Sequence, residues 1–253
     1  MINCFRFLCL VTAVFLQQPG APAPLTVSAA ISLTDALEEA GRAYRAAGGG
    51  EVRFNFGGSN VLARQILNGA PVDLFVSADE AQMKLIEAAG AIAPDTRVDL
   101  LGNKLAVVLS PSAPAVKDAE GLAQPGIRRM ALGDPDAVPA GVYAKQYLQS
   151  AGVWDRLLAR IVPVANVRAA LTAVETGNVE AAIVYESDLA AASRARLAFV
   201  VSGPAAPRIV YPAAILARSK NRREAERFLA FLRGNEGSAI FKRFRFEPIA
   251  GPH

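Results

Sequence analysis

The sequence predicts an α/β fold in which mostly parallel sheets are covered by helices. Short apolar runs alternate with amphipathic helical stretches along nearly the whole chain. Glycine stands where most of these helices should end, as is typical of C-terminal caps. These glycines are Gly48, Gly69, Gly90, Gly152, Gly177 and Gly234. The 253 residues, of which 52% are hydrophobic and 20% charged, suffice for one large domain or for two lobes of roughly 100 residues each.

Short apolar runs bounded by glycine, proline or polar residues predict the strands. The predicted strands are Leu25–Ala29, Val52–Phe56, Leu74–Ser77, Leu105–Leu109, Arg129–Leu132, Ile161–Ala165, Ala181–Tyr185, Ala198–Val201 and Val210–Leu216. Apolar residues at helical spacing predict the helices between them. The predicted helices are Leu33–Ala47, Asn60–Asn68, Glu80–Ala89, Gly141–Ser150, Trp154–Arg160, Val167–Thr176, Asp188–Arg194, Arg222–Arg233 and Gly237–Phe244. The apolar helix faces pack on the sheets, so residues with a function are expected at the helix starts.

Residues 1–23 are predicted to be a secretory signal peptide. Arg6 is the only charge before an apolar run from Phe7 to Leu16, and the small residues of Gly20–Ala23 follow. The run is about ten residues long, which is short for a bilayer span. We therefore expect a soluble, exported protein; the alternative is an apolar N-terminal strand or helix.

Cysteine and histidine are nearly absent beyond this segment. Cys4 and Cys9 lie inside it, and the single histidine is His253. The sequence thus argues against disulfides, a thiol nucleophile, a histidine base, and a metal site built from cysteine or histidine. The net charge is +4, but the basic residues are dispersed rather than gathered in a stripe with aromatic residues, so nucleic-acid binding is not expected.

Small and polar residues stand where several predicted strands run into helices. Ser32 precedes the first helix with Asp35 three residues later, which is close to a capping box. The other starts are Phe56–Asn60, Gly133–Gly141 and Ala165–Arg168. Taken singly, each start is an ordinary capped helix.

Taken together, these helix starts predict an anion site. In open α/β sheets, ligands bind outside the carboxyl ends of the strands, which is where these helices begin. Each start offers free backbone N–H groups and about half a positive charge. Serine hydroxyls and glycine-flanked amides can surround a compact oxyanion without lysine or arginine. Tyr185 ends a predicted strand, where its phenol either packs half-buried or donates to the same anion.

The sequence resembles a known family, the periplasmic molybdate-binding proteins of ABC importers. The matching blocks are "AAISLTDAL" (29–37), "LARQILNGAPVDLFVSAD" (62–79), "LLGNKLAVVL" (100–109), "GDPDAVPAGVYAKQYL" (133–148), "VRAALTAVE" (167–175), "IVYESD" (183–188) and "IFKRFRF" (240–246). They extend over nearly the whole mature chain in the order of the family. Their combination is specific, although no single block is.

The resemblance implies a two-lobed periplasmic-binding-protein fold of type II, with the ligand in the cleft between the lobes. Lobe 1 is expected to comprise residues 24–104 and 208–253, and lobe 2 residues 105–207. The implied ligand-binding groups are the hydroxyls of Ser32 and Ser59, the backbone N–H groups of Ala140 and Val167, and the hydroxyl of Tyr185.

The function that the resemblance implies is capture of molybdate or tungstate and delivery to the membrane subunits of an ABC permease. Molybdenum would be bound as its oxyanion, with no cofactor and no residue that ligates a metal cation. The protein would be a periplasmic monomer and not an enzyme.

Two alternatives stay open at this point. The same fold could bind sulfate, phosphate or a small carboxylate; a carboxylate would call for an arginine, and Arg64 and Arg168 stand near helix starts. Alternatively, Ser32 or Ser59 could be a nucleophile with Lys104 or Lys145 as its base. No Ser-x-x-Lys or Gly-x-Ser-x-Gly motif supports this enzyme.

Overall fold

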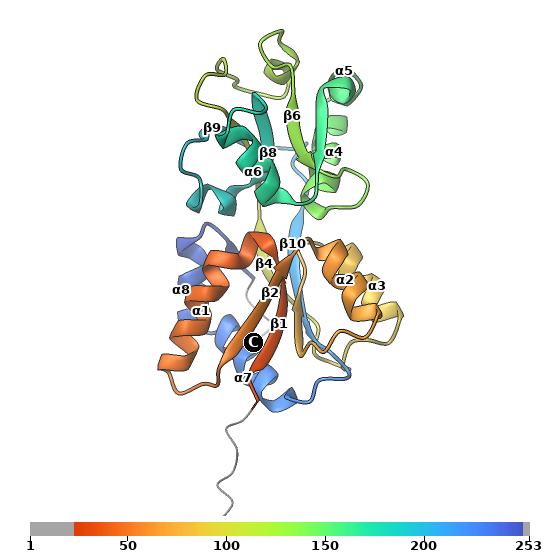
Figure 1. The fold of residues 1–253 in the computed structure, drawn as a ribbon, viewed down its shortest axis with the longest axis vertical. Helices are drawn as coiled ribbons and strands as arrows, with labels where there is room; N and C mark the ends of the chain where they lie inside the picture. The colour runs from red at the N-terminus through yellow and green to blue at the C-terminus, as the bar shows by residue number, and fades with distance from the viewer. Residues whose placement is uncertain (1–22, 250–253) are drawn as a thin grey trace, which may run out of the picture.

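The structure is a computed structural model and describes residues 23–249. The predicted signal peptide, apart from Ala23, lies outside these residues, as do both cysteines and His253. Figure 1 shows two lobes, one above the other along the long axis of the molecule. No helix in residues 23–249 combines the length and the apolar composition needed to cross a membrane.

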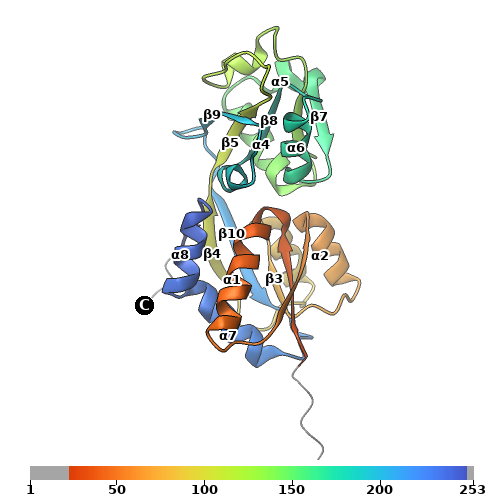
Figure 2. The same ribbon diagram turned by 60° about the vertical axis from the view of Figure 1, so that its left-hand side comes forward.

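The first lobe is built on a sheet of six strands in the order β11-β4-β10-β3-β1-β2. Its strands are β1 (Leu25–Ala30), β2 (Val52–Gly57), β3 (Leu74–Val76), β4 (Val98–Asn103), β10 (Ile209–Ile215) and β11 (Glu247–Pro248). Its helices are α1 (Thr34–Ala46), α2 (Ser59–Leu67), α3 (Glu80–Ala88), α7 (Arg222–Arg233) and α8 (Asn235–Arg243). Helices α1, α7 and α8 lie on one side of this sheet and α2 and α3 on the other (Figures 1 and 2).

The second lobe is built on a sheet of five strands in the order β7-β6-β8-β5-β9. Its strands are β5 (Leu105–Leu109), β6 (Met130–Gly133), β7 (Ile161–Val164), β8 (Ala181–Tyr185) and β9 (Arg196–Val200). Its helices are α4 (Pro139–Ser150), α5 (Trp154–Leu157) and α6 (Val167–Glu175). Strands β5 and β8 are buried along their whole length, so this sheet forms the centre of the lobe.

The predicted two-lobed α/β architecture is confirmed, with one refinement: both sheets are mixed. Strands β1, β2 and β3 are parallel, as are β6, β7 and β8. Strand β10 runs antiparallel to β3 and β4, and β5 runs antiparallel to β8 and β9. The reason is the chain path. After β4 and β9 the chain crosses to the other lobe, so β5 and β10 enter their sheets from the cleft, where the parallel strands end.

Several predicted elements differ from the observed ones. Strands β4 and β11 were not predicted, because Gly102 interrupts the first and the second has only two residues. The helix predicted over Asp188–Arg194 is a 3-10 turn, η4 (Glu186–Ala190), and that over Trp154–Arg160 is α only as far as Leu157. Five of the six predicted cap glycines have φ between 69° and 88°. Gly234, with φ of −73°, instead joins α7 directly to α8.

Candidate functional site

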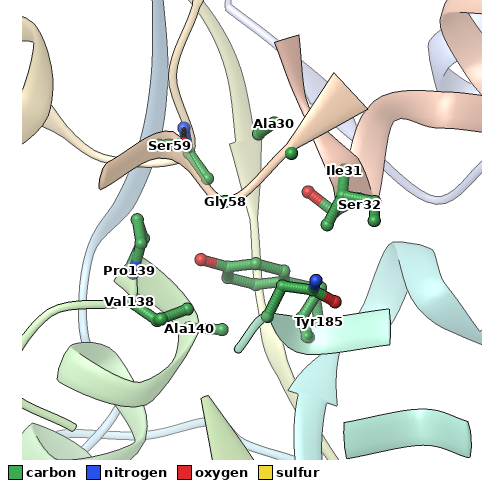
Figure 3. A pocket seen from close by; sticks show the side chains of 13 residues that line it. Ala30, Ile31, Ser32, Gly58, Ser59, Val138, Pro139, Ala140 and Tyr185 are labelled. Carbon is green, nitrogen blue, oxygen red and sulfur yellow. Dashed lines mark hydrogen bonds between the residues drawn. The ribbon is translucent and has the colours of Figure 1, made fainter. Parts of the chain in front are cut away.

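A small cavity lies between the two lobes, at the carboxyl ends of strands and the starts of helices (Figure 3). It is lined by Ala30, Ile31, Ser32, Gly57, Gly58, Ser59, Ala78, Val138, Pro139, Ala140, Asn166, Val167 and Tyr185. All five predicted site residues are among them. The space open to the centre of a water-sized sphere is about 20 Å³, and one water needs roughly 10–15 Å³ on that measure. The cavity therefore suits a compact ion rather than a large organic molecule.

Ser32 reaches the cavity from a 3-10 turn, η1 (Ile31–Leu33), that connects β1 to α1. The predicted capping box is wrong, because the Ser32 side chain makes no capping bond to either helix and Asp35 pairs with Arg168 instead. The buried Ser32 Oγ lies 3.0 Å from the hydroxyl oxygen of Tyr211. A hydroxyl can make more than one hydrogen bond, so Ser32 can also bond to a group in the cavity. Figure 3 shows its oxygen pointing into the cavity.

Ser59 is the first residue of α2, and the residue before it, Gly58, is the N-cap and has no side chain to cap the helix. Its hydroxyl oxygen accepts a hydrogen bond of 2.9 Å from the backbone N–H of Ala78. Because a hydroxyl has one proton and two lone pairs, the proton of Ser59 is still available as a donor. Ser59 thereby offers a donor to the cavity from the second helix start of lobe 1.

Lobe 2 presents two helix starts with unused backbone donors. Helix α4 has no side-chain cap, and Pro139 at its first turn has no N–H. The Gly141 N–H already donates to the Val138 carbonyl, whereas the Ala140 N–H has no hydrogen bond within residues 23–249. At α6, the Asn166 side chain caps the Ala169 N–H.

The Val167 N–H, at the first position of α6, likewise donates to no group of the described chain. Free N–H groups at helix starts attract anions through their partial positive charge. The amides of Ala140 and Val167 are thus unused backbone donors that the lobe 2 helix starts place at the cavity wall.

Tyr185 ends β8 and, within the described part of the chain, is the one phenol that lines the cavity. Its side chain is buried, yet its hydroxyl has no hydrogen-bond partner among residues 23–249. Burial raises the pKa of this phenol well above its ordinary value, so the group stays protonated and can donate. Leaving a buried hydroxyl unpaired costs about 1–3 kcal/mol, and a ligand oxygen in the cavity would remove that cost. Figure 3 shows the hydroxyl pointing towards the side where Ser59 and Pro139 lie.

The charged residues considered from the sequence do not line this cavity. Arg168 lies between two carboxylates: its Nη2 is 2.7 Å from Asp35 Oδ2, across the cleft, and its Nε is 2.9 Å from Asp188 Oδ1. The suggestion that Arg168 binds a carboxylate ligand is therefore wrong, because two carboxylates of the protein already hold it. Arg64 is exposed on α2.

The lysines that the enzyme alternative required are also used elsewhere. Lys104 forms an ion pair with Glu247, and Lys145 Nζ lies 2.7 Å from Asp136 Oδ1. Neither lysine lines the cavity that Ser32 and Ser59 line. Among residues 23–249, no cluster of histidine, cysteine, aspartate or glutamate has the arrangement of a metal site.

Sequence reasoning did not identify the residues behind the cavity wall. Tyr211 contacts Ser32 and Asn103 contacts Tyr211, and these two residues come from β10 and β4, far away from Ser32 in the chain. Tyr211 is a single aromatic residue in an apolar strand, and nothing in the local pattern distinguishes it from core. Only the pairing of β10 with β4 brings these two side chains together.

Comparisons with known proteins identify the family of the chain. Residues 25–247 match the family described as bacterial extracellular solute-binding protein. The chain is 38% identical over 230 residues to molybdate-binding protein ModA of Escherichia coli (strain K12), covering 88% of each chain.

Two solved structures are similar. One is the periplasmic molybdate-binding protein of Azotobacter vinelandii, with a TM-score of 0.77 and 29% identity over 90% of this chain and 100% of that one. The other is the substrate-binding domain of a proposed molybdenum ABC transporter from Clostridium difficile, with a TM-score of 0.71 and 30% identity over 89% and 99% of the two chains.

Proposed function

Because the chain belongs to the family of bacterial extracellular solute-binding proteins, with molybdate-binding proteins among its relatives, we propose that it captures molybdate or tungstate and delivers it to an ABC importer. The oxyanion would be held by the hydroxyls of Ser32, Ser59 and Tyr185 and the N–H groups of Ala140 and Val167. Proteins of this family are carriers in transport, which is not an enzyme class.

One observation carries the proposal: neutral donors from both lobes surround a small cavity that no lysine or arginine of residues 23–249 lines. Burying an unpaired ion costs several kcal/mol, so an anion in this cavity needs these donors or a cation. The free amides at α4 and α6 and the unpaired Tyr185 hydroxyl supply them. An anionic organic ligand would need more room and usually an arginine, and Arg168 is already paired with Asp35 and Asp188.

Molybdate is favoured over sulfate by size. Both are tetrahedral dianions, but sulfate has shorter bonds to oxygen. Donors placed for the larger ion would be too far from some sulfate oxygens, and a partly satisfied set of buried polar groups is costly. Sulfate thus remains the alternative that the binding measurement must test.

The division into lobes extends the same proposal. Lobe 1 would comprise residues 24–104 and 208–253 and lobe 2 residues 105–207, and the lobes would close on the ion by bending at the two crossing segments. The protein would act as a monomer in the periplasm, after removal of residues 1–23 as a signal peptide, and would contact the permease transiently.

Titration of the mature protein with molybdate, tungstate, sulfate and phosphate tests the function. We expect molybdate and tungstate to bind and to raise the thermal stability, by about 2.7 kcal/mol when the ligand is at 100 times its Kd. The measurement combines isothermal calorimetry with thermal unfolding. A clear shift with sulfate and none with molybdate or tungstate would overturn the proposal.

Removing single hydroxyls tests the site. Ser32→Ala, Ser59→Ala and Tyr185→Phe are each expected to weaken molybdate binding about tenfold or more, because a hydrogen bond to a charged group is worth about 1.5–3 kcal/mol. Calorimetric Kd values measure the loss. The matched controls are Ser238→Ala on α8 and Tyr44→Phe, whose hydroxyl bonds to Glu224; neither residue lines the cavity. Unchanged affinity in all three site variants would refute the assignment.

A further inference from the structure

Tyr211 connects the cavity to a buried polar group behind it. It lies on β10 with its side chain fully buried. Its hydroxyl oxygen lies 3.0 Å from Ser32 Oγ on one side and 3.2 Å from Asn103 Nδ2 on the other. Tyr211 itself does not line the cavity. Its ring packs edge-on against that of Tyr185, with the ring centroids 5.6 Å apart, whereas its hydroxyl reaches the cavity through Ser32.

The orientation of the Asn103 amide is determined by its neighbours. Its Oδ1 accepts a hydrogen bond of 2.8 Å from the Lys104 backbone N–H, which can only donate. Its Nδ2 therefore faces the other way and donates both of its protons, to Ser187 Oγ at 2.9 Å and to the Tyr211 hydroxyl oxygen at 3.2 Å. The Tyr211 oxygen is thus an acceptor towards Asn103.

The direction of the next bond follows from this one. Tyr211 cannot donate back to Asn103 Nδ2, because an amide NH₂ has no acceptor. Burial raises the pKa of the Tyr211 phenol well above its ordinary value, so the proton stays on the oxygen. Within the described chain the remaining partner is Ser32 Oγ, and leaving a buried donor unpaired costs about 1–3 kcal/mol. Ser32 therefore accepts from Tyr211, and its own proton must go elsewhere.

We propose that Asn103 and Tyr211 form a hydrogen-bond relay that turns the hydroxyl proton of Ser32 into the cavity, so that Ser32 meets the ligand as a donor. This inference rests on the proposed function and deepens it. Asn103 and Tyr211 are positioning residues: neither touches the ion, and both act through Ser32. The relay links β4 and β10, the strands next to the two crossings between the lobes, to η1, the turn that carries Ser32.

Ser59 also faces the ligand as a donor, but for a separate reason: its oxygen already accepts a hydrogen bond from the Ala78 N–H. With the phenol of Tyr185 and two backbone N–H groups, the five proposed binding groups then all act as donors. A fully ionised oxyanion can accept from every one of them. In an oxyanion that carries a proton, that proton would face another donor and have no acceptor, which is unfavourable in a buried site.

A double-mutant cycle on the full mature protein tests the relay. Tyr211→Phe is expected to weaken molybdate binding about three- to tenfold, the loss that follows when Ser32 is no longer oriented. In the Ser32→Ala background the same substitution should change the Kd by less than about twofold, because the group it orients is gone. Asn103→Ala, measured in the same two backgrounds, repeats the test if Tyr211→Phe is too unstable to measure.

Tyr44→Phe is the matched control, since it also removes a buried hydroxyl that makes one side-chain hydrogen bond in lobe 1. It should leave the Kd unchanged. Equal losses with and without the Ser32 hydroxyl would mean a merely structural role for Tyr211 and would overturn the relay, as would no loss when Ser32 is intact. The cycle can be run with whichever oxyanion the wild-type protein binds. A wrong assignment of molybdate is thereby distinguishable from a wrong relay, and binding of no oxyanion would overturn both.

Discussion

Arg168→Met is expected to lower the free energy of unfolding by about 3 kcal/mol at pH 8, because it removes the counter-charge of a buried carboxylate. Asp188 is 0% exposed and pairs with Arg168 through Oδ1, while its Oδ2 accepts from the Tyr185 N–H at 3.0 Å. Breaking a buried ion pair costs about 3–5 kcal/mol, and the lower end applies since the Arg168 side chain is 21% exposed. Chemical denaturation at a series of pH values measures the loss.

The loss should depend on pH in one direction. Burial raises the pKa of Asp188 from 3.8 to about 6, although Arg168 pulls it down. A raised carboxyl pKa adds stability that is fully present below the unfolded value and is lost as the pH rises through the folded value. Without Arg168 the folded pKa rises further, so the variant falls increasingly behind the wild-type protein between pH 5 and pH 8. A pH-independent gap would contradict this account.

Two controls separate the parts of this cluster. Asp35→Asn breaks only the arm that crosses the cleft, to a carboxylate whose side chain is 43% exposed, and should cost less than about 1 kcal/mol. Arg222→Met breaks an exposed pair with Glu226 on α7 and should cost under about 0.5 kcal/mol. A loss in either control as large as that in Arg168→Met would show that burial of Asp188 is not the cause.

Gly141→Ala is expected to destabilise the protein by about 3 kcal/mol and to weaken molybdate binding at least tenfold. A Cβ at Gly141 would lie 1.9 Å from the Gly133 carbonyl oxygen and 2.6 Å from that of Asp134. Both atoms are backbone at the end of β6, so α4 would have to move away from the sheet. Because Ala140 precedes this glycine, the move withdraws its N–H from the cavity. Denaturant unfolding and calorimetry measure the two effects.

Gly102→Ala in β4 is the matched control, since its Cβ would meet nothing nearer than the Glu247 side chain at 3.4 Å. It should change the stability by less than about 1 kcal/mol and leave the affinity unchanged. If Gly141→Ala behaved like this control, the close contact between α4 and β6 would not be what places the Ala140 amide.

Local patterns predicted most helices and strands because their causes are local. In α1 the buried positions Ala36, Leu37, Ala40 and Tyr44 follow helical spacing, and no distant residue is needed to see it. The antiparallel course of β5 and β10 could not be found in this way. It depends on where the chain crosses between lobes, and the strand sequences themselves carry no direction.

For the candidate site, the sequence by itself determined which residue types stand at the helix starts, and these predicted an anion site of neutral donors. The family resemblance added which five positions would bind. Only the tertiary structure decided that these positions line one cavity, that Arg168 is held by two carboxylates, and that Tyr211 and Asn103 stand behind Ser32. The physical reason is distance along the chain: a helix start is set by neighbours a few residues away, whereas Ser32, Tyr211 and Asn103 meet through strand pairing between segments more than a hundred residues apart.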